Sequence, residues 1–133
     1  MTLIGENRNK VVITNHLNNA NTGSSSECAT VRIKGDNFKA FDITFQNTSP
    51  YTAVDGQAPA LYAYGNKHFY QNCNFFSLKN TLLSYQGSHY FKMCYIRGTT
   101  DFIWGFGRAV FERCFIHVGN VNGKPGYITA NVS

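Results

Sequence analysis

Long apolar runs, charged residues and closely paired cysteines are all scarce in this chain of 133 residues. No stretch reaches the roughly 20 consecutive apolar residues that a membrane-spanning helix needs. The N-terminal stretch MTLIGENRNK lacks the apolar run of a secretory signal peptide. The four cysteines are too few for a small disulfide scaffold, and they lack the close pairing of a zinc site. These absences argue against a transmembrane protein, a disulfide-based mini-protein and a zinc-binding module.

The composition is that of a folded domain with a mild excess of positive charge. Charged residues make up 14% of the chain and hydrophobic residues 43%, which disfavours intrinsic disorder. A length of 133 residues is enough for one domain with its own core. The net charge of +5 permits a polyanionic partner, but it is also typical of a solvated basic surface. The charge by itself therefore leaves the partner open.

A repeat runs through the second half of the sequence. Residues 61–73 align without a gap with residues 82–94, at an offset of 21. The aligned pairs are Leu61 and Leu82, Tyr64 and Tyr85, His68 and His89, and Cys73 and Cys94. A third copy at 111–116 follows 91–96 at an offset of 20, and a weaker copy at 38–43 precedes them. Each copy reads aromatic-x-x-small or apolar-x-apolar, which predicts a strand with one inward face.

The repeat predicts the fold class. Short alternating strands, 12 glycines as turn formers and the lack of helical periodicity indicate an all-β protein. A period near 21 with several short strands predicts a right-handed single-stranded parallel β-helix, with about 20–21 residues per coil. Leucine-rich repeats share this period, but the Leu-x-x-Leu-x-Leu pattern is absent.

Equivalent side chains of successive coils should form ladders about 4.8 Å apart. Cys73, Cys94 and Cys114 would then form an inward ladder, either as buried thiols that fill the core or with a disulfide between Cys73 and Cys94. His68 and His89 should also stack, and we expect them on the surface rather than as metal ligands. No cluster of carboxylates, histidines or cysteines has the spacing of a metal site.

Stacking also brings polar residues of three coils together. The offset of 21 that relates the repeats maps Asn80 onto Asp101, and Gln57 falls 23 residues before Asn80. Gln57, the Lys79–Asn80 pair and Asp101 would therefore line one groove, next to Trp104. An aspartate in this setting is also typical of a turn or a cap, so spacing alone leaves its role open.

Six blocks of the sequence stand in an order and spacing specific to one family. The blocks are MTLIG at 1–5, GDNFKAFDITFQNT at 35–48, QAPAL at 57–61, KNTL at 79–82, GTTDFIWG at 98–105 and YITA at 127–130. Together they resemble the pectin methylesterases, in particular the plant cell-wall branch. The family fold is a right-handed parallel β-helix, which agrees with the repeat. Its members hydrolyse the methyl esters of polygalacturonate and release methanol.

The resemblance implies an aspartyl esterase that needs no metal or cofactor. In this family one aspartate attacks the ester carbonyl to give an acyl-enzyme, and a second protonates the leaving methanol and then activates water. Glutamine amides stabilise the oxyanion, an arginine positions the nucleophile and aromatic residues line the cleft. By motif position, Asp101 is expected to be the nucleophile, Gln57 an oxyanion donor and Trp104 a substrate-binding aromatic residue.

The chain departs from the family pattern at several of these positions. Asn80 stands where the acid/base aspartate belongs, and losing a general acid–base costs about 10²–10⁴-fold in rate. Lys79 replaces the second oxyanion glutamine, and its cation would favour the ionised form of Asp101. Leu83 takes the place of a substrate-binding tyrosine. Residues 129–133, Thr-Ala-Asn-Val-Ser, replace the motif that ends in the positioning arginine.

These observations leave three hypotheses for the function. In the first, the chain is an active pectin methylesterase in which another group replaces the acid. In the second, it is a catalytically impaired homologue that binds pectin. In the third, it is a structural β-helix fragment with neither role. A pectate lyase would need a calcium-binding cluster, which seven scattered acidic residues do not supply. The expected partner is methyl-esterified pectin, with no nucleic acid and no membrane.

The resemblance also predicts the extent of the domain and its location. We expect residues 1–133 to form one partial β-helix domain that lacks the N-terminal coils and the C-terminal segment of the family's catalytic domain. For the parent protein, the resemblance implies secretion to the plant cell wall.

Overall fold

The computed structural model describes residues 1–50, 56–119 and 127–130, the last four by their backbone alone. The chain forms thirteen strands and two short helices in these ranges. In chain order they are β1 (Thr2–Ile4), β2 (Val12–Asn15), α1 (Asn19–Thr22), α2 (Ser25–Cys28), β3 (Val31–Lys34), β4 (Lys39–Phe41), β5 (Thr44–Asn47), β6 (Leu61–Gln71), β7 (Asn74–Phe76), β8 (Leu82–Lys92), β9 (Tyr95–Gly98), β10 (Thr100–Trp104), β11 (Arg108–Glu112), β12 (Phe115–Val118) and β13 (Tyr127–Ala130).

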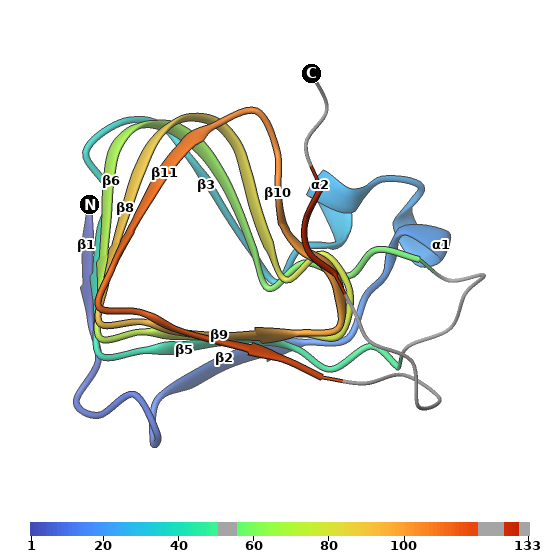
Figure 1. Cartoon of the computed structure of the whole chain (residues 1–133), viewed down its shortest axis with the longest axis horizontal. Helices are drawn as coiled ribbons and strands as arrows, with labels where there is room; N and C mark the ends of the chain where they lie inside the picture. Colours follow the sequence, from blue (N-terminus) through green and yellow to red (C-terminus); the bar gives the residue numbers. More distant parts are fainter. Residues whose placement is uncertain (51–55, 120–126, 131–133) are drawn as a thin grey trace.

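Two parallel sheets wind around one core. The first sheet has the order β1-β4-β6-β8-β10-β13, with β3 also paired to β6 and β11 to β8. The second has the order β12-β9-β7-β5-β2. Viewed down the stack, successive coils lie almost over one another around a triangular outline (Figure 1). The parallel β-helix predicted from the repeat is confirmed.

A single residue in the left-handed region makes the corner between the two sheets in each coil. Asp42, Asn72, Met93 and Arg113 have φ of 60°, 55°, 54° and 51°, and each follows the last residue of β4, β6, β8 or β11. Asparagine and aspartate tolerate this conformation best. The Asn72 amide also donates a hydrogen bond of 2.6 Å to the Asp42 carboxylate on the neighbouring coil. The residue after each corner then points into the core, and it is a cysteine in three of the four coils.

The spacing of the repeat is confirmed for the later coils. Leu61 pairs with Leu82 and Phe91 with Phe111, at the predicted offsets of 21 and 20. The weaker copy at 38–43 is out of register by two residues, because Phe41 pairs with Gln71 and leaves Ile43 at the cysteine position. Lys39 pairs with Phe69, so this coil takes 30 residues and carries an insertion that hid its register.

The gapless alignment of residues 61–73 with 82–94 is wrong in one place. Tyr64 pairs with Gln86 rather than with Tyr85, and the predicted register returns at His68 and His89. A β-bulge therefore adds one residue to β8 at Tyr85, a change that a constant offset cannot show. Gly65 and Gly87 lie at this bend with φ of +141° and +104°. A Cβ atom on Gly87 would lie 1.8 Å from the Gly65 carbonyl oxygen, so only glycine fits there.

Aromatic and thiol ladders fill the interior. Tyr70 and Phe91 stack with ring centroids 4.8 Å apart, and Phe91 and Phe111 follow at 5.0 Å. Cys73 and Cys94 are buried and Cys114 is half-buried, and all three are thiols. Hydrogen bonds with the Cys114 and Cys73 thiols, followed by burial, raise the pKa of Cys94, which keeps it protonated. The inward cysteine ladder is thus confirmed, with thiols filling the core.

The two stacked histidines are buried, which corrects the prediction that they lie on the surface. Their rings are 4.8 Å apart, and their exposed fractions are 1% for His68 and 2% for His89. His68 Nε2 donates to the Gly35 carbonyl over 2.6 Å, and His89 Nε2 donates to the Gly65 carbonyl over 3.1 Å. Each imidazole therefore ties its coil to the glycine bend of the coil before it, a structural task that sequence spacing did not reveal.

Candidate active site

The segments that enter three successive strands lie side by side. Ala58 N donates to the Lys79 carbonyl over 3.1 Å, and Ala60 N donates to the Thr81 carbonyl over 2.8 Å. Thr99 N donates to the Leu78 carbonyl over 2.8 Å, and β8 pairs with β10 through Leu82 and Ile103. The backbones that carry Gln57, Lys79–Asn80 and Asp101 are therefore neighbours on consecutive coils, as the offset predicts. The catalytic and binding roles assigned to these residues from the family resemblance stay predictions.

Asn80 lies just before β8 in an unusual environment. Its φ is 59°, in the left-handed region that asparagine and aspartate tolerate. The residue is 3% exposed, and its Oδ1 is buried without a hydrogen-bond partner. An unsatisfied buried acceptor costs about 1–3 kcal/mol, so this oxygen calls for a donor that the described residues do not supply. Sequence spacing could not show this missing partner.

Trp104 and Leu83, the two predicted substrate-binding positions, pack in one cluster of apolar side chains. They are paired in register on β10 and β8. Leu83 is 2% exposed and packs in a cluster with Ala29 and Tyr62, against which Trp104 and Tyr85 lie half-buried. The Trp104 Nε1–H is buried, and no acceptor for it lies among the residues that the structure describes. A donor and an acceptor therefore both lack partners in this part of the chain.

The other predicted site residues are placed mainly by their backbones. Asp101 lies within β10, and its side chain is outside the described residues. Lys79 and Gln57 are half-buried, and the Gln57 carbonyl accepts a hydrogen bond of 3.4 Å from the Cys28 thiol. β10 pairs with β13 through Ile103 and Thr129, so the segment 129–130 borders the same strand. Positions 131–133, where the family motif carries its arginine, lie outside the described residues.

A run of aromatic side chains next to Trp104 was missed by the sequence prediction. The Tyr85 ring stacks at 5.4 Å on Tyr62 and at 5.8 Å on Tyr64, and it meets the Phe106 ring edge-on at 5.8 Å. The β-bulge makes this possible, because the extra residue on β8 brings Tyr85 between two rings of β6. The signal in the sequence was the alternation of aromatic residues at 62 and 64, but their side of the sheet was not predicted.

A serine–histidine pair lies behind this surface. Ser84 Oγ donates to His89 Nδ1 over 2.6 Å, while His89 Nε2 already donates to the Gly65 carbonyl. Ser84 is 4% exposed, so a substrate carbonyl cannot reach its hydroxyl. Burial lowers the pKa of His89 to about 4, with a further contribution from His68. The pair therefore stabilises the bend in its neutral form and is not a nucleophile–base pair.

The described residues contain no group of three His, Cys, Asp or Glu side chains that could hold a metal ion. Nor does any helix within the described ranges have the length and apolar character to cross a membrane.

Solved structures that superpose on this chain include pectin methylesterases. Pectin methylesterase from carrot superposes with a TM-score of 0.90 and 31% identity, covering 98% of this chain and 40% of the carrot chain. Pectin methylesterase PemA from Erwinia chrysanthemi superposes with a TM-score of 0.87 and 26% identity, covering 98% of this chain and 45% of PemA. The fold is thus the parallel β-helix of the pectin methylesterases.

Sequence comparison gives the same class. The chain matches the pectinesterase family over residues 1–132. Putative pectinesterase 14 of Arabidopsis thaliana is 36% identical over 142 residues, which span 97% of this chain and 43% of the relative. Pectinesterase 3 of Citrus sinensis is 35% identical over 128 residues, spanning 96% of this chain and 22% of the relative. The chain belongs to the pectinesterase family, and it spans less than half the length of these relatives.

Proposed function

We propose that this chain is a pectin-binding member of its family in which ester hydrolysis is strongly impaired. The observation that carries the proposal is Asn80, a buried amide with an unpartnered oxygen at the position of the family's acid/base aspartate. An amide has no proton to give to a leaving alkoxide at neutral pH, whereas a carboxylic acid does. The change therefore removes proton transfer and keeps hydrogen bonding.

The unpartnered polar atoms suit a carbohydrate ligand. Asn80 Oδ1 needs a donor and Trp104 Nε1–H needs an acceptor. A sugar hydroxyl is both a donor and an acceptor. Because both atoms are buried, a bound chain can pair with them only when the side chains that cover them move aside. Each pairing would remove a desolvation cost of about 1–3 kcal/mol, which favours the bound state. One related pectin methylesterase has been solved in complex with a hexasaccharide, which supports a sugar chain as the ligand.

The remaining charges favour an acidic polymer. Lys79 next to Asn80 replaces a neutral glutamine of the family pattern, and the net charge of the chain is +5. Polygalacturonate carries a carboxylate on every unit that is not esterified, so it is attracted to such a surface. Pectin is a polymer of plant cell walls, and we place the parent protein there as part of this proposal. Residues 1–133 then form one partial β-helix domain that carries the sugar-binding face.

The substitution Asn80→Asp tests the catalytic part of the proposal. Aspartate tolerates the left-handed backbone of this position, so the change adds no strain. A carboxyl here would be buried next to no donor, which raises its pKa toward that of a general acid. We expect methanol release from methylated pectin to rise by about 10²–10⁴-fold over the wild-type rate. Asp101→Ala in the same background should abolish that gain.

Asn37→Asp is the matched control. Asn37 also has a positive φ, of 64°, but it is exposed. It should leave methanol release unchanged. Rapid methanol release by the wild-type chain, with no gain from Asn80→Asp, would contradict impaired hydrolysis. If pectin in the gel does not slow the wild-type chain in affinity electrophoresis, the binding role is contradicted. The hypothesis of a structural β-helix fragment then remains.

A further inference from the structure

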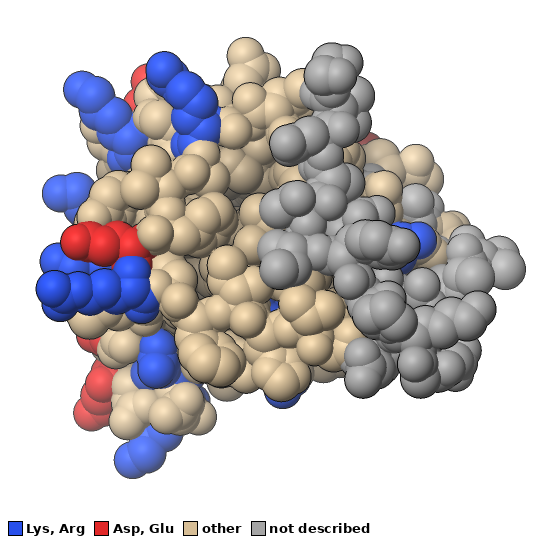
Figure 2. Space-filling model, viewed as in Figure 1, with Lys and Arg blue, Asp and Glu red and all other residues tan. Residues whose placement is uncertain are grey.

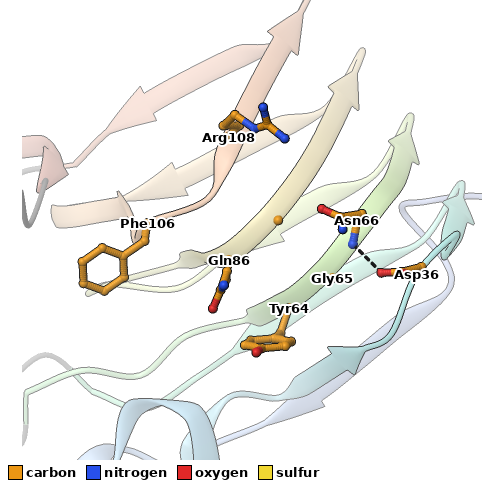
Figure 3. A pocket seen from close by; sticks show the side chains of 8 residues that line it. Asp36, Tyr64, Gly65, Asn66, Gln86, Phe106 and Arg108 are labelled. Carbon is orange, nitrogen blue, oxygen red and sulfur yellow. Dashed lines mark hydrogen bonds between the residues drawn. The ribbon is translucent and has the colours of Figure 1, made fainter.

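A groove crosses four coils at the outer corner where β6 and β8 bend. It has a volume of about 500 Å³, within the range of pockets that hold small ligands. Figure 3 shows the side chains around it, which come from the loop after β3, from β6, from β8 and from the turn into β11. They are Asp36, Tyr64, Asn66, Gln86, Phe106 and Arg108, with the backbone of Gly65 and Gly87 as the floor.

Two exposed aromatic rings flank the groove. Tyr64 is 40% exposed and Phe106 is 56% exposed, which is high for side chains of this size. Both pack against the Tyr85 ring with centroids 5.8 Å away, so their positions are fixed by stacking. The electron-rich face of an aromatic ring attracts the C–H edge of a pyranose. The rings therefore offer rigid platforms to a sugar chain.

The polar side chains of the groove favour an anionic ligand. The exposed Arg108 guanidinium can bind a carboxylate through two parallel hydrogen bonds, and the exposed Gln86 amide also lines the groove. Lys67 lines a second cavity, of about 320 Å³, that shares Arg108 with the groove. The one acidic side chain, Asp36, is engaged, because its Oδ1 accepts a hydrogen bond of 2.8 Å from Asn66 N.

The wider surface agrees with this charge. Lysine and arginine side chains, with fewer acidic side chains among them, gather along the left and upper left edge in Figure 2, the side where Figure 1 shows β1, β6, β8 and β11. Lys34 on β3 pairs in register with Tyr64, which puts a further exposed cation next to the groove. An acidic ligand would therefore approach this corner through a favourable field.

The groove is continuous with the candidate active site. Tyr85 stacks on Tyr64 and meets Phe106 at the groove, and it also lies in the cluster that contains Trp104 and Leu83. We propose that the groove is a second binding subsite that takes free galacturonate units of the pectin chain held at Asn80 and Trp104. This inference rests on the proposed function and adds which units of the polymer bind here. A free carboxylate can form an ion pair with Arg108, whereas a methyl ester cannot.

The test measures affinity by isothermal titration calorimetry with two ligands of about ten galacturonate units, one unesterified and one fully methyl-esterified. Arg108→Gln should weaken binding of the unesterified oligomer about fivefold at low salt and leave the esterified one unchanged. The difference should vanish near 1 M salt. Phe106→Ala should weaken binding of both oligomers, since stacking does not depend on the carboxylate. Asp36→Asn should strengthen binding of the unesterified oligomer.

Two matched controls separate the groove from general surface effects. Arg113→Gln removes an exposed arginine from the opposite end of β11, and Phe115→Ala removes a phenylalanine that is 60% exposed on the other sheet. Both should bind as the wild type does. If Arg108→Gln weakens binding no more than Arg113→Gln, or weakens the two oligomers equally, the subsite is refuted while the proposed function stands. If the wild type binds neither oligomer, the proposed function fails and this inference fails with it.

Discussion

Mild acid should destabilise this protein through His89, which the fold holds in its neutral form. His89 is 2% exposed, and both ring nitrogens are engaged. Nε2 must carry the hydrogen, because it faces the Gly65 carbonyl, and Nδ1 then accepts the hydroxyl proton of Ser84. A second proton on Nδ1 would break this arrangement and place a charge beside the His68 ring, 4.8 Å away. Burial, followed by His68, lowers the pKa of His89 from 6.5 to about 4.

The direction of the pH effect follows from this lowered pKa. Between about pH 6.5 and pH 4 the unfolded chain binds a proton at His89 that the folded chain does not, so the free energy of unfolding falls as the pH falls. The full difference in pKa corresponds to about 3 kcal/mol. Because the folded state itself begins to bind the proton near pH 4, we expect about 2 kcal/mol to be lost between pH 7 and pH 4.5. Below pH 4 this contribution should level off.

Urea unfolding at pH 7, 5.5 and 4.5, followed by tryptophan fluorescence, measures the effect. His89→Gln should be less stable than the wild type at pH 7 but should lose about 2 kcal/mol less between pH 7 and pH 4.5. His16→Gln, which changes an exposed histidine, is the matched control and should follow the wild-type curve. If His89→Gln and the wild type lose the same stability between these pH values, the buried neutral histidine is not the cause.

Two further predictions concern the bend and the core. Gly87→Ala should prevent folding or lower the free energy of unfolding by more than about 3 kcal/mol, because the new Cβ would lie 1.8 Å from the Gly65 carbonyl oxygen. In the control Gly23→Ala the new Cβ has no atom within 4 Å, so the loss should be about 1 kcal/mol. Thermal unfolding by circular dichroism measures both, and equal losses would refute the steric argument. Phe91→Ala removes a fully buried ring that stacks on two neighbours, and it should lower the free energy of unfolding by about 3–5 kcal/mol. Phe115 is 60% exposed, so Phe115→Ala should lower it by less than about 1.5 kcal/mol. Chemical denaturation measures both losses. A loss for Phe91→Ala as small as that for Phe115→Ala would contradict the proposed ladder energetics.

Much of the fold was predictable because equivalent residues of successive coils share one environment. Leu61 and Leu82 both close the same inward face, and Cys73 and Cys94 both follow a corner, so their similarity survives as a repeat in the sequence. The family motifs likewise mark the strand ends that meet at the site. Asn80 was singled out by the offset of 21 that maps it onto Asp101 and by its place in the family motif.

Other features depend on contacts between coils that leave no periodic trace. The bulge at Tyr85 shifts the register by one residue and restores it before His89, so a constant offset passed over it. The weaker copy was misread because its coil holds 30 residues. His68 and His89 were expected outside because imidazole is polar, and the acceptor that makes burial favourable is a backbone carbonyl of another coil.

The sequence by itself determined the β-helix and the inward cysteine ladder, because both follow from residue types that recur at a regular spacing. It also determined the membership of the pectinesterase family, because the family motifs occur in order along the chain. Only the tertiary structure decided which polar groups find partners. The two buried histidines donate to glycine carbonyls, whereas Asn80 Oδ1 and Trp104 Nε1 have no partner among the described residues. The tertiary structure also brings Tyr64, Tyr85 and Phe106 into contact across three coils. The physical reason is that hydrogen bonds and ring stacking act over a few ångströms between coils, whereas sequence periodicity reports only the average face of each strand.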